Sequence, residues 1–191
     1  MILFINACVR PESRTLALAR RTAEYIKGEY EFVDLYNEDI KPLDNERLSF
    51  REECSLKGDF TDSMFRYAEQ FSRADEIIIA APFWDLSFPS VLKCYTEAIC
   101  VNGITFRYSE EGIPEGLCRA RRLIYVTTAG GYIPEDNCGF NYIKQLCEGF
   151  FGIDASVMIK AEGLDIYGAD IDGILSAAEK EAASALNSTG R

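Results

Sequence analysis

The chain has 191 residues, carries 31 Asp and Glu against 20 Lys and Arg, and contains no histidine, which gives a formal net charge of −11. The missing histidine excludes Ser-His-Asp and Cys-His catalysis and HExxH zinc sites. The acidity argues against nucleic acid and anionic membrane surfaces as partners, because both are bound mainly through clustered cations.

Strand-like and helix-like segments alternate along the first half of the chain. A continuous apolar run at residues 2–5 predicts a buried strand, and a turn-rich segment follows it. From Ser13 the apolar residues recur at helical spacing, which predicts a helix that ends at Gly28. Residues 31–35 alternate as a second strand, and the polar residues 45–59 predict a short helix and a loop.

The same alternation continues through the second half. Residues 60–73 predict a helix, and residues 76–81 are short, β-branched and apolar, as expected of a strand buried on both faces. Pro89 fits the first turn of a further helix that runs to about residue 101. The remaining predicted elements are strands at residues 123–127 and 155–159 and helices at residues 137–151 and 170–186.

Five strands with intervening helices favour an α/β fold with a parallel sheet and right-handed crossovers, and an α+β fold is the alternative. Residues 103–116 interrupt the alternation with a strand-and-turn pattern. No internal repeat or low-complexity linker divides the chain, and its length suits one domain. We therefore expect a single domain over residues 1–191.

Seven cysteines are scattered along the chain, at positions 8, 54, 94, 100, 118, 138 and 147. Their odd number and the lack of a CxxC pair predict neither a disulfide framework nor a zinc site. The N-terminal apolar run is too short for a signal-peptide core, and no apolar stretch is long enough to span a membrane. The sequence thus predicts a reduced, cytoplasmic protein that acts away from membranes.

Ligands of doubly wound sheets bind at the carboxyl ends of the strands, where three loops of this chain are expected to meet. The loop after the first strand opens a helix with the hydroxyls of Ser13 and Thr15 and the cations of Arg10 and Arg14. Free N–H groups at a helix N-terminus make a phosphate site. The alternative is that Ser13 only caps the helix. The loop has neither the GxGxxG nor the GxxxxGK[ST] pattern, which speaks against a dinucleotide fingerprint or a P-loop.

The loops after the third and fourth strands offer a second set of contacts. The PFWDLS loop exposes Trp84, the only tryptophan, beside Phe83. A flat ring along this loop would accept hydrogen bonds from the backbone N–H groups of Trp84 to Leu86; alternatively, the aromatic side chains fill the edge of the core. Gly130 and Gly131 either permit close approach of a ligand or form an ordinary tight turn.

Four segments, taken together in their order and spacing, carry a family resemblance: NACVRPESRT, APFWDLSFPSVLKCY, CVNGITFRYSEEGIPEGL and TTAGGY. The third is close to the motif G-x-T-F-R-Y-x-E-x-G-x-x-G-L. On these segments the chain resembles the FMN-dependent NADH:quinone oxidoreductase and azoreductase family over nearly its whole length. The resemblance implies a flavodoxin-like α/β fold with a five-stranded parallel sheet in the order 2-1-3-4-5 and helices on both faces.

The resemblance also implies a reaction. FMN would be the cofactor, NADH or NADPH the cosubstrate, and a quinone, azo compound or similar electron-poor small molecule the acceptor. Two electrons would pass through flavin N5 in two half-reactions at one site, by a ping-pong mechanism. The family works as a homodimer with the flavin near the interface. The alternative function is a flavodoxin-type electron carrier that depends on a separate reductase.

Matching positions receive roles from the same resemblance. The FMN phosphate would be held by Arg10, Ser13, Arg14 and Thr15. The isoalloxazine would be lined by Pro82, Phe83, Trp84, Asp85 and Leu86, and its other edge closed by Thr128, Ala129, Gly130, Gly131 and Tyr132. No side chain is assigned as catalytic, because protons would come from water or from Tyr132. Phe50 and Phe60 are candidates for a lid over the partner's site.

Cys8 follows the first strand and has two interpretations. It is either a reactive thiol near the flavin phosphate or a small residue that closes a buried strand. The sequence offers no resolving cysteine beside it, so packing is the favoured interpretation.

Overall fold

A five-stranded parallel sheet forms the centre of the molecule in the computed structural model, which describes residues 1–187. Its strands are β1 (Ile2–Asn6), β2 (Tyr30–Asp34), β3 (Glu76–Ala80), β6 (Leu123–Thr128) and β7 (Ser156–Ala161). They lie in the order β2-β1-β3-β6-β7, and each neighbouring pair is parallel. Counted within the sheet alone, this is the order 2-1-3-4-5, so the predicted fold is confirmed.

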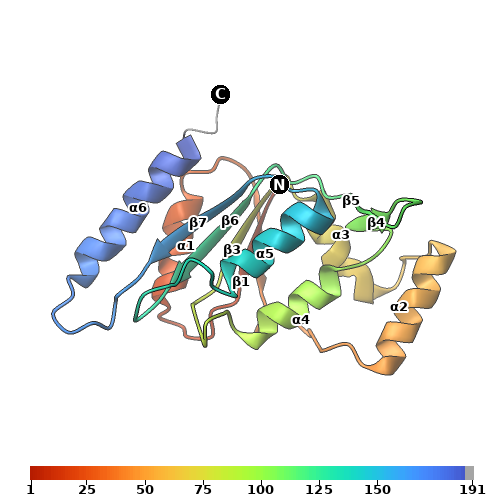
Figure 1. Cartoon of the computed structure of the whole chain (residues 1–191), viewed down its shortest axis with the longest axis horizontal. Helices are drawn as coiled ribbons and strands as arrows, with labels where there is room; N and C mark the ends of the chain where they lie inside the picture. The colour runs from red at the N-terminus through yellow and green to blue at the C-terminus, as the bar shows by residue number, and fades with distance from the viewer. Residues whose placement is uncertain (188–191) are drawn as a thin grey trace.

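Helices cover both faces of the sheet (Figure 1). One face carries α1 (Arg14–Ala23) and α6 (Ile171–Asn187), and the other carries α3 (Arg66–Arg73), α4 (Ser90–Ile99) and α5 (Phe140–Leu146). Successive side chains of a strand point to opposite faces. In β1, Leu3 and Ile5 therefore pack towards α3–α5, whereas Ile2 and Phe4 pack towards α1 and α6. Burial on both faces explains the continuous apolar runs of these strands.

Residues 103–117, which include the GxTFRY motif, form a hairpin that closes the end of α4. β4 (Phe106–Tyr108) and β5 (Pro114–Gly116) pair antiparallel, as the strand-and-turn pattern predicts. The buried hydroxyl of Thr105 donates a hydrogen bond to the carbonyl oxygen of Ile99 at 2.6 Å. The amide of Val101 donates to the same oxygen at 2.9 Å, so the two bonds together satisfy a carbonyl that the last turn of α4 leaves without a helical partner. The motif that carries the family resemblance most specifically thus has a structural role here.

Helix α2 (Asn45–Lys57) extends away from the sheet (Figure 1) and is longer than the short helix predicted for this segment. The Asp44 side chain accepts a hydrogen bond from a first-turn amide at 2.9 Å, and Gly58 ends the helix in the left-handed conformation at φ 65°. Arg51 donates to the carbonyl oxygen of Glu97 at 2.9 Å, which fixes α2 against α4.

Helix α1 ends earlier than its apolar pattern predicts. The helix stops at Ala23 instead of Gly28, although Ile26 is still buried in the core. The hydroxyl of Tyr30 lies within hydrogen-bond distance of the carbonyl oxygens of Ala23 and Ile26, and its one hydrogen is shared between them. Because a side chain from the next strand bonds these carbonyls, the chain leaves the helix without stranding them in an apolar environment. Spacing alone does not reveal a partner that lies on another element.

Two further predicted helices are divided. The segment 60–73 begins with a 3-10 turn, Ser63–Phe65, before α3, because the Asp62 side chain accepts a hydrogen bond from the amide of the second residue of that turn at 2.8 Å. The segment 137–151 starts α5 only at Phe140 and then continues as a π-helix, Cys147–Phe151. The 3-10 and π segments are too short, at 3 and 5 residues, for their different periods to be seen in the apolar pattern, so the sequence predicts one continuous helix in each case.

Gly116 packs directly against the backbone that follows the π-helix. A Cβ at position 116 would lie 2.1 Å from the amide nitrogen of Gly152. Because backbone cannot move aside like a flexible side chain, we expect Gly116→Ala to lower the free energy of unfolding by about 2–3 kcal/mol. Urea denaturation measures this change. Gly149→Ala is the matched control, since a Cβ there meets nothing within 4 Å; equal stability of the two variants would contradict the packing argument.

Candidate functional site

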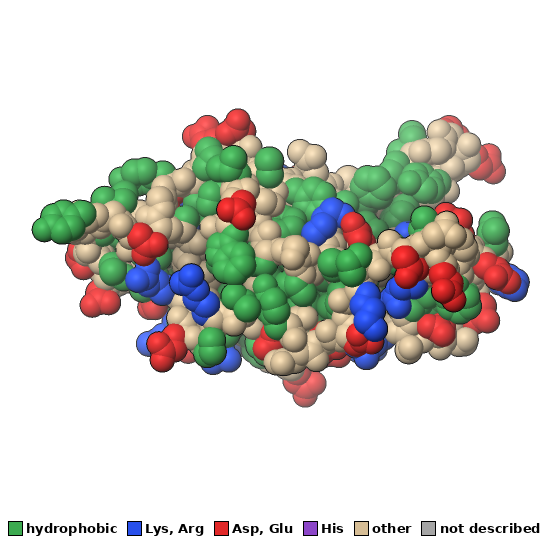
Figure 2. Space-filling model, turned by 90° about the horizontal axis from the view of Figure 1, so that it is seen from below, with side chains coloured by type: hydrophobic (Ala, Val, Ile, Leu, Met, Phe, Trp, Pro, Cys, Tyr) green, Lys and Arg blue, Asp and Glu red, His purple; other side chains and the backbone are tan. Residues whose placement is uncertain are grey.

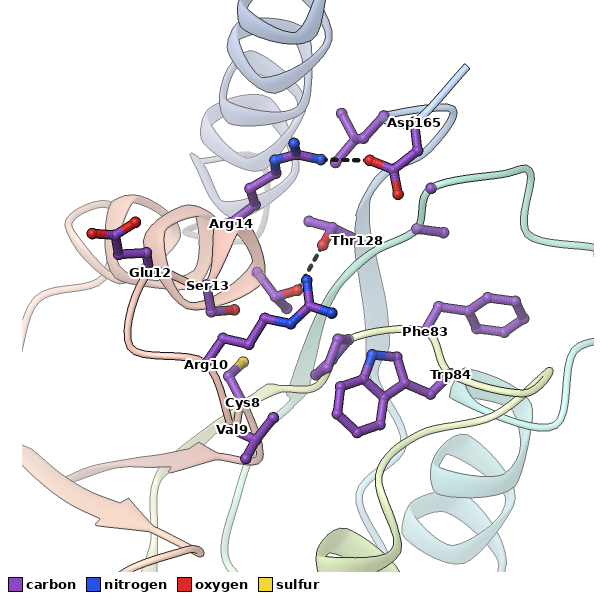
Figure 3. A pocket seen from close by; sticks show the side chains of 15 residues that line it. Cys8, Val9, Arg10, Glu12, Ser13, Arg14, Phe83, Trp84, Thr128 and Asp165 are labelled. Atoms are coloured by element: carbon purple, nitrogen blue, oxygen red, sulfur yellow. Dashed lines mark hydrogen bonds and ion pairs between the residues drawn. The ribbon is translucent and has the colours of Figure 1, made fainter. Parts of the chain in front are cut away.

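Four loops meet at the carboxyl end of the sheet and enclose a pocket of about 360 Å³ (Figure 3). They follow β1, β3, β6 and β7. The pocket is lined by Cys8, Val9, Arg10, Glu12, Ser13, Arg14, Thr15, Pro82, Phe83, Trp84, Thr128, Ala129, Gly130, Leu164 and Asp165. Of the predicted cofactor contacts, only Asp85, Leu86, Gly131 and Tyr132 are not among these residues, and each is close in the chain to one that is.

The loop after β1 delivers the N-terminus of α1 to this pocket. The Ser13 hydroxyl accepts a hydrogen bond from the amide of Leu16 at 3.2 Å, so Ser13 caps the helix. The hydroxyls of Thr15 and Thr128 are 2.6 Å apart and buried, which joins the first turn of α1 to the end of β6. Within the described chain, the amides of Arg14 and Thr15 have no hydrogen-bond acceptor, and such groups at a helix N-terminus favour an anion.

The two arginines of this loop differ in their partners. Arg14 forms an ion pair with Asp165, with its Nη1 atom 3.0 Å from the carboxylate oxygen Oδ1. Arg10 has no ion-pair partner among residues 1–187, and Figure 3 shows its side chain extending across the pocket. Arg10 is therefore the cation that remains available to an anionic ligand.

The loop after β3 makes a tight turn at the pocket edge. The amide of Trp84 donates to the carbonyl oxygen of Ser87 at 3.0 Å, and the reverse bond is 2.7 Å. The Trp84 amide is therefore already bonded within the turn and, in this conformation, is not free to donate to a flat ring. The amides of Asp85 and Leu86 have no acceptor in the described part of the chain, so the ring-binding prediction rests on these two.

Both residues at the tip of this turn adopt left-handed backbone conformations, with φ 49° at Asp85 and 65° at Leu86. Such angles are costly for residues with a Cβ. Leu86 is also largely exposed, so a glycine there loses little packing. We expect Leu86→Gly to raise the free energy of unfolding by about 1 kcal/mol, measured by urea denaturation. A fall in stability would show that the Leu86 side chain contributes contacts that outweigh the backbone strain.

In the loop after β6, only one of the two glycines is required by its neighbours. A Cβ on Gly130 would lie 2.3 Å from the Oδ2 atom of Asp165, whereas one on Gly131 would meet nothing within 4 Å. The amide of Asp165 donates to the carbonyl oxygen of Gly130 at 3.0 Å, so the loop after β7 is bonded directly to this one. Tyr132, the predicted proton donor, is 75% exposed and does not line the pocket.

Sequence reasoning placed three loops at the site and missed the fourth. Leu164 and Asp165 follow β7, the last strand of the sheet, and complete the wall beside Gly130. The signal was present, because the rule that ligands bind at strand carboxyl ends applies to every parallel strand. Glu12 and Val9 of the first loop also line the pocket without having been predicted.

The comparisons with known proteins agree with this geometry. A family model described as "flavodoxin-like fold" matches residues 1–186. The chain is 38% identical to FMN-dependent NADH:quinone oxidoreductase 2 of Clostridium acetobutylicum over 91% of the chain and 92% of the relative. It is 35% identical to the FMN-dependent NADH:quinone oxidoreductase of Clostridium beijerinckii over 93% of both chains. The chain belongs to the FMN-dependent NADH:quinone oxidoreductase family.

Solved structures share the fold of this family member at lower identity. An FMN-dependent NADH-azoreductase from Bacillus anthracis, in complex with FMN, has a TM-score of 0.81 and 24% identity, covering 100% of this chain and 99% of its own. A second azoreductase structure from the same organism has a TM-score of 0.81 and 23% identity, covering 98% of both chains. Within residues 1–187, no helix is long and apolar enough to cross a membrane, and no acidic or cysteine cluster suits a metal ion.

Cys8 lines the pocket of this family member and is buried. Its thiol lies 3.6 Å from the carbonyl oxygen of Ala80. Burial raises the pKa of the Cys8 thiol to about 11, and a hydrogen bond with Ser13 only partly offsets this rise. The thiol therefore stays protonated at neutral pH, which supports the packing interpretation.

This protonation state predicts slow alkylation. We expect brief treatment with iodoacetamide at about pH 7.5 to modify Cys138, which is exposed, well before Cys8. Peptide mass spectrometry at several reaction times measures the order. Cys138→Ser is the control that removes the fast site. Modification of Cys8 as fast as that of Cys138 would restore the reactive-thiol interpretation.

Proposed function

We propose that this protein is an FMN-dependent oxidoreductase that passes two electrons from NADH or NADPH to a quinone, an azo compound or a similar electron-poor acceptor. The proposal is supported by the family membership of the chain and by relatives of 35–38% identity that are named FMN-dependent NADH:quinone oxidoreductases. The observation that carries it is the pocket itself, which has a cationic end and an aromatic end.

The residues present suit a flavin mononucleotide. Arg10 and the free amides of Arg14 and Thr15 supply positive charge and donors for a phosphate group. Phe83 and Trp84 supply apolar surface for a ring system on the opposite side of the pocket (Figure 3). An acidic protein of net charge −11 holds a dianionic group only where such local donors gather.

FMN, when bound, accepts a hydride from a nicotinamide and passes two electrons to a second substrate, so the protein need supply only position and hydrogen bonds. The amides of Asp85 and Leu86 are placed to orient the ring, because the turn fixes both outside any internal hydrogen bond. The chain has no histidine to supply protons. We therefore assign the proton source to water or to Tyr132, whose side chain is exposed two positions after Gly130 of the pocket wall.

The test starts from apoprotein prepared without flavin. We expect added FMN to bind, NADH under nitrogen to bleach the visible flavin bands, and benzoquinone to restore them. A protein whose bound flavin is reduced only after a separate reductase is added would be a flavodoxin-type carrier instead. A protein that binds no FMN would overturn both functions.

Steady-state kinetics test the shared site. If NADH and the acceptor occupy the same position in turn, double-reciprocal plots at several acceptor concentrations should run parallel. Intersecting lines would show that both substrates bind together, which contradicts a ping-pong mechanism.

We also propose that the protein is a cytoplasmic homodimer made of one domain per chain. Figure 2, which looks at the end of the sheet that holds the pocket, shows hydrophobic side chains gathered across that face. Large apolar side chains exposed near the pocket include Trp84, Leu86, Tyr132, Ile166 and Tyr167. Such a surface favours association with a second copy. Light scattering after size-exclusion chromatography measures the mass of the protein in solution; a monomer at micromolar concentration would refute the dimer.

The cytoplasmic location is supported by the cysteines. All seven are free, which favours a reducing compartment.

A further inference from the structure

Asp165 is an acidic residue in the wall of the pocket, and it lies at the end that also holds Arg10 and Arg14. Its amide donates to the carbonyl oxygen of Gly130, and its Oδ2 atom lies 2.3 Å from where a Cβ on Gly130 would stand. The backbone of the neighbouring Leu164 is bonded to Ala129 at 3.2 Å. These bonds fix the backbone of Asp165 at the pocket wall, while its side chain is largely exposed to solvent.

The Asp165 carboxylate forms an ion pair with Arg14, one of the two arginines that line the pocket. Arg14 and Asp165 are separated by 151 positions in the chain, and their ion pair joins the start of α1 to the loop after β7. Figure 3 shows the pair at the rim, while Arg10 extends into the pocket and Glu12 points away from it. An acidic group beside an anion site weakens anion binding, both by direct repulsion and by neutralising the cation it pairs with.

We propose that Asp165 sets the affinity of the pocket for the phosphate group of the cofactor by holding Arg14 in an ion pair. Asp165 is then a positioning residue that acts through Arg14, and it makes the cofactor more readily exchangeable than two free arginines would. The inference rests on the proposed function, since it concerns the phosphate of FMN. Under this proposal Arg14 strengthens phosphate binding, and Asp165 weakens it.

The test compares FMN with riboflavin, which has the same ring system but no phosphate. Asp165→Asn keeps the size of the side chain and its contact with Gly130 while removing the charge. Quenching of flavin fluorescence gives the dissociation constant of each ligand for apoprotein. In about 20 mM salt we expect Asp165→Asn to bind FMN about 3- to 10-fold more tightly and riboflavin unchanged. At about 0.5 M salt the gain should largely vanish, because the pair is exposed and screened.

An Arg14→Gln background shows whether the effect passes through Arg14. There the Asp165→Asn gain should fall by at least half, since no cation is left to release. Weaker FMN binding by Asp165→Asn, or an equal change for riboflavin, would overturn the proposal. Wild-type apoprotein that binds no FMN would overturn the proposed function and this inference together, whereas wild-type binding that Asp165→Asn leaves unchanged would overturn the inference alone.

Discussion

Replacing Arg10 with Gln is expected to weaken FMN binding by roughly 10- to 100-fold, as fits the loss of a charge-assisted hydrogen bond. The physical reason is that Arg10 is the pocket cation without an ion-pair partner in the described structure. Arg14→Gln should cost only a few-fold, because the charge of Arg14 is already balanced by Asp165. Fluorescence titration of apoprotein with FMN measures both losses.

Two controls test whether the losses of affinity are specific to the phosphate group and to the pocket. Riboflavin affinity should stay the same in both variants, since neither arginine is expected to contact the ring. Arg20→Gln, in the last turn of α1 and not among the residues that line the pocket, should bind FMN like the wild type. If Arg14→Gln lost as much affinity as Arg10→Gln, the phosphate would have to lie at the rim instead of inside the pocket.

The second large effect concerns stability. Glu76 is 5% exposed at the start of β3, and its Oε2 atom lies 2.6 Å from Nε of Arg122. Removing one member of a buried pair leaves the other charge in a poorly solvated position, so we expect Glu76→Gln to lower the free energy of unfolding by about 3 kcal/mol. Urea denaturation monitored by circular dichroism measures the change.

The neighbouring acid provides the matched control. Asp75 is more exposed, and it pairs with the N-terminal amine and with Arg119. The amine holds the pKa of the Asp75 carboxyl below its ordinary value. Asp75→Asn should nevertheless lower the free energy of unfolding much less than Glu76→Gln does, because solvent screens exposed pairs. Comparable losses in the two variants would contradict the claim that burial makes the Glu76 pair important.

Much of the fold followed from local pattern. The apolar runs of β1, β3 and β6 belong to strands buried on both faces, and such runs are hard to confuse with an exposed strand. Helix ends were harder to predict from the sequence, because they depend on hydrogen-bond partners elsewhere in the chain. α1 stops at Ala23, whose carbonyl oxygen the Tyr30 hydroxyl contacts, and the apolar spacing carries no trace of that contact.

The candidate site was predictable to the extent that it depends on strand ends. Loops after β1, β3 and β6 were expected to converge, and they do. The family resemblance supplied the chemistry, since Ser13 or Trp84 alone fits capping or core packing equally well. The GxTFRY segment shows the limit of motif reasoning, because its Thr105 supports α4 and none of its residues lines the pocket.

The sequence by itself determined the α/β class and the exclusion of histidine chemistry, because composition and short-range periodicity are properties of the chain alone. Only the tertiary structure decided which arginine is available. Arg10 and Arg14 look equivalent along the chain, yet a carboxylate 151 positions away pairs with one of them. Electrostatic interactions depend on distance in space, and that distance is set by how the loop after β7 packs on Gly130.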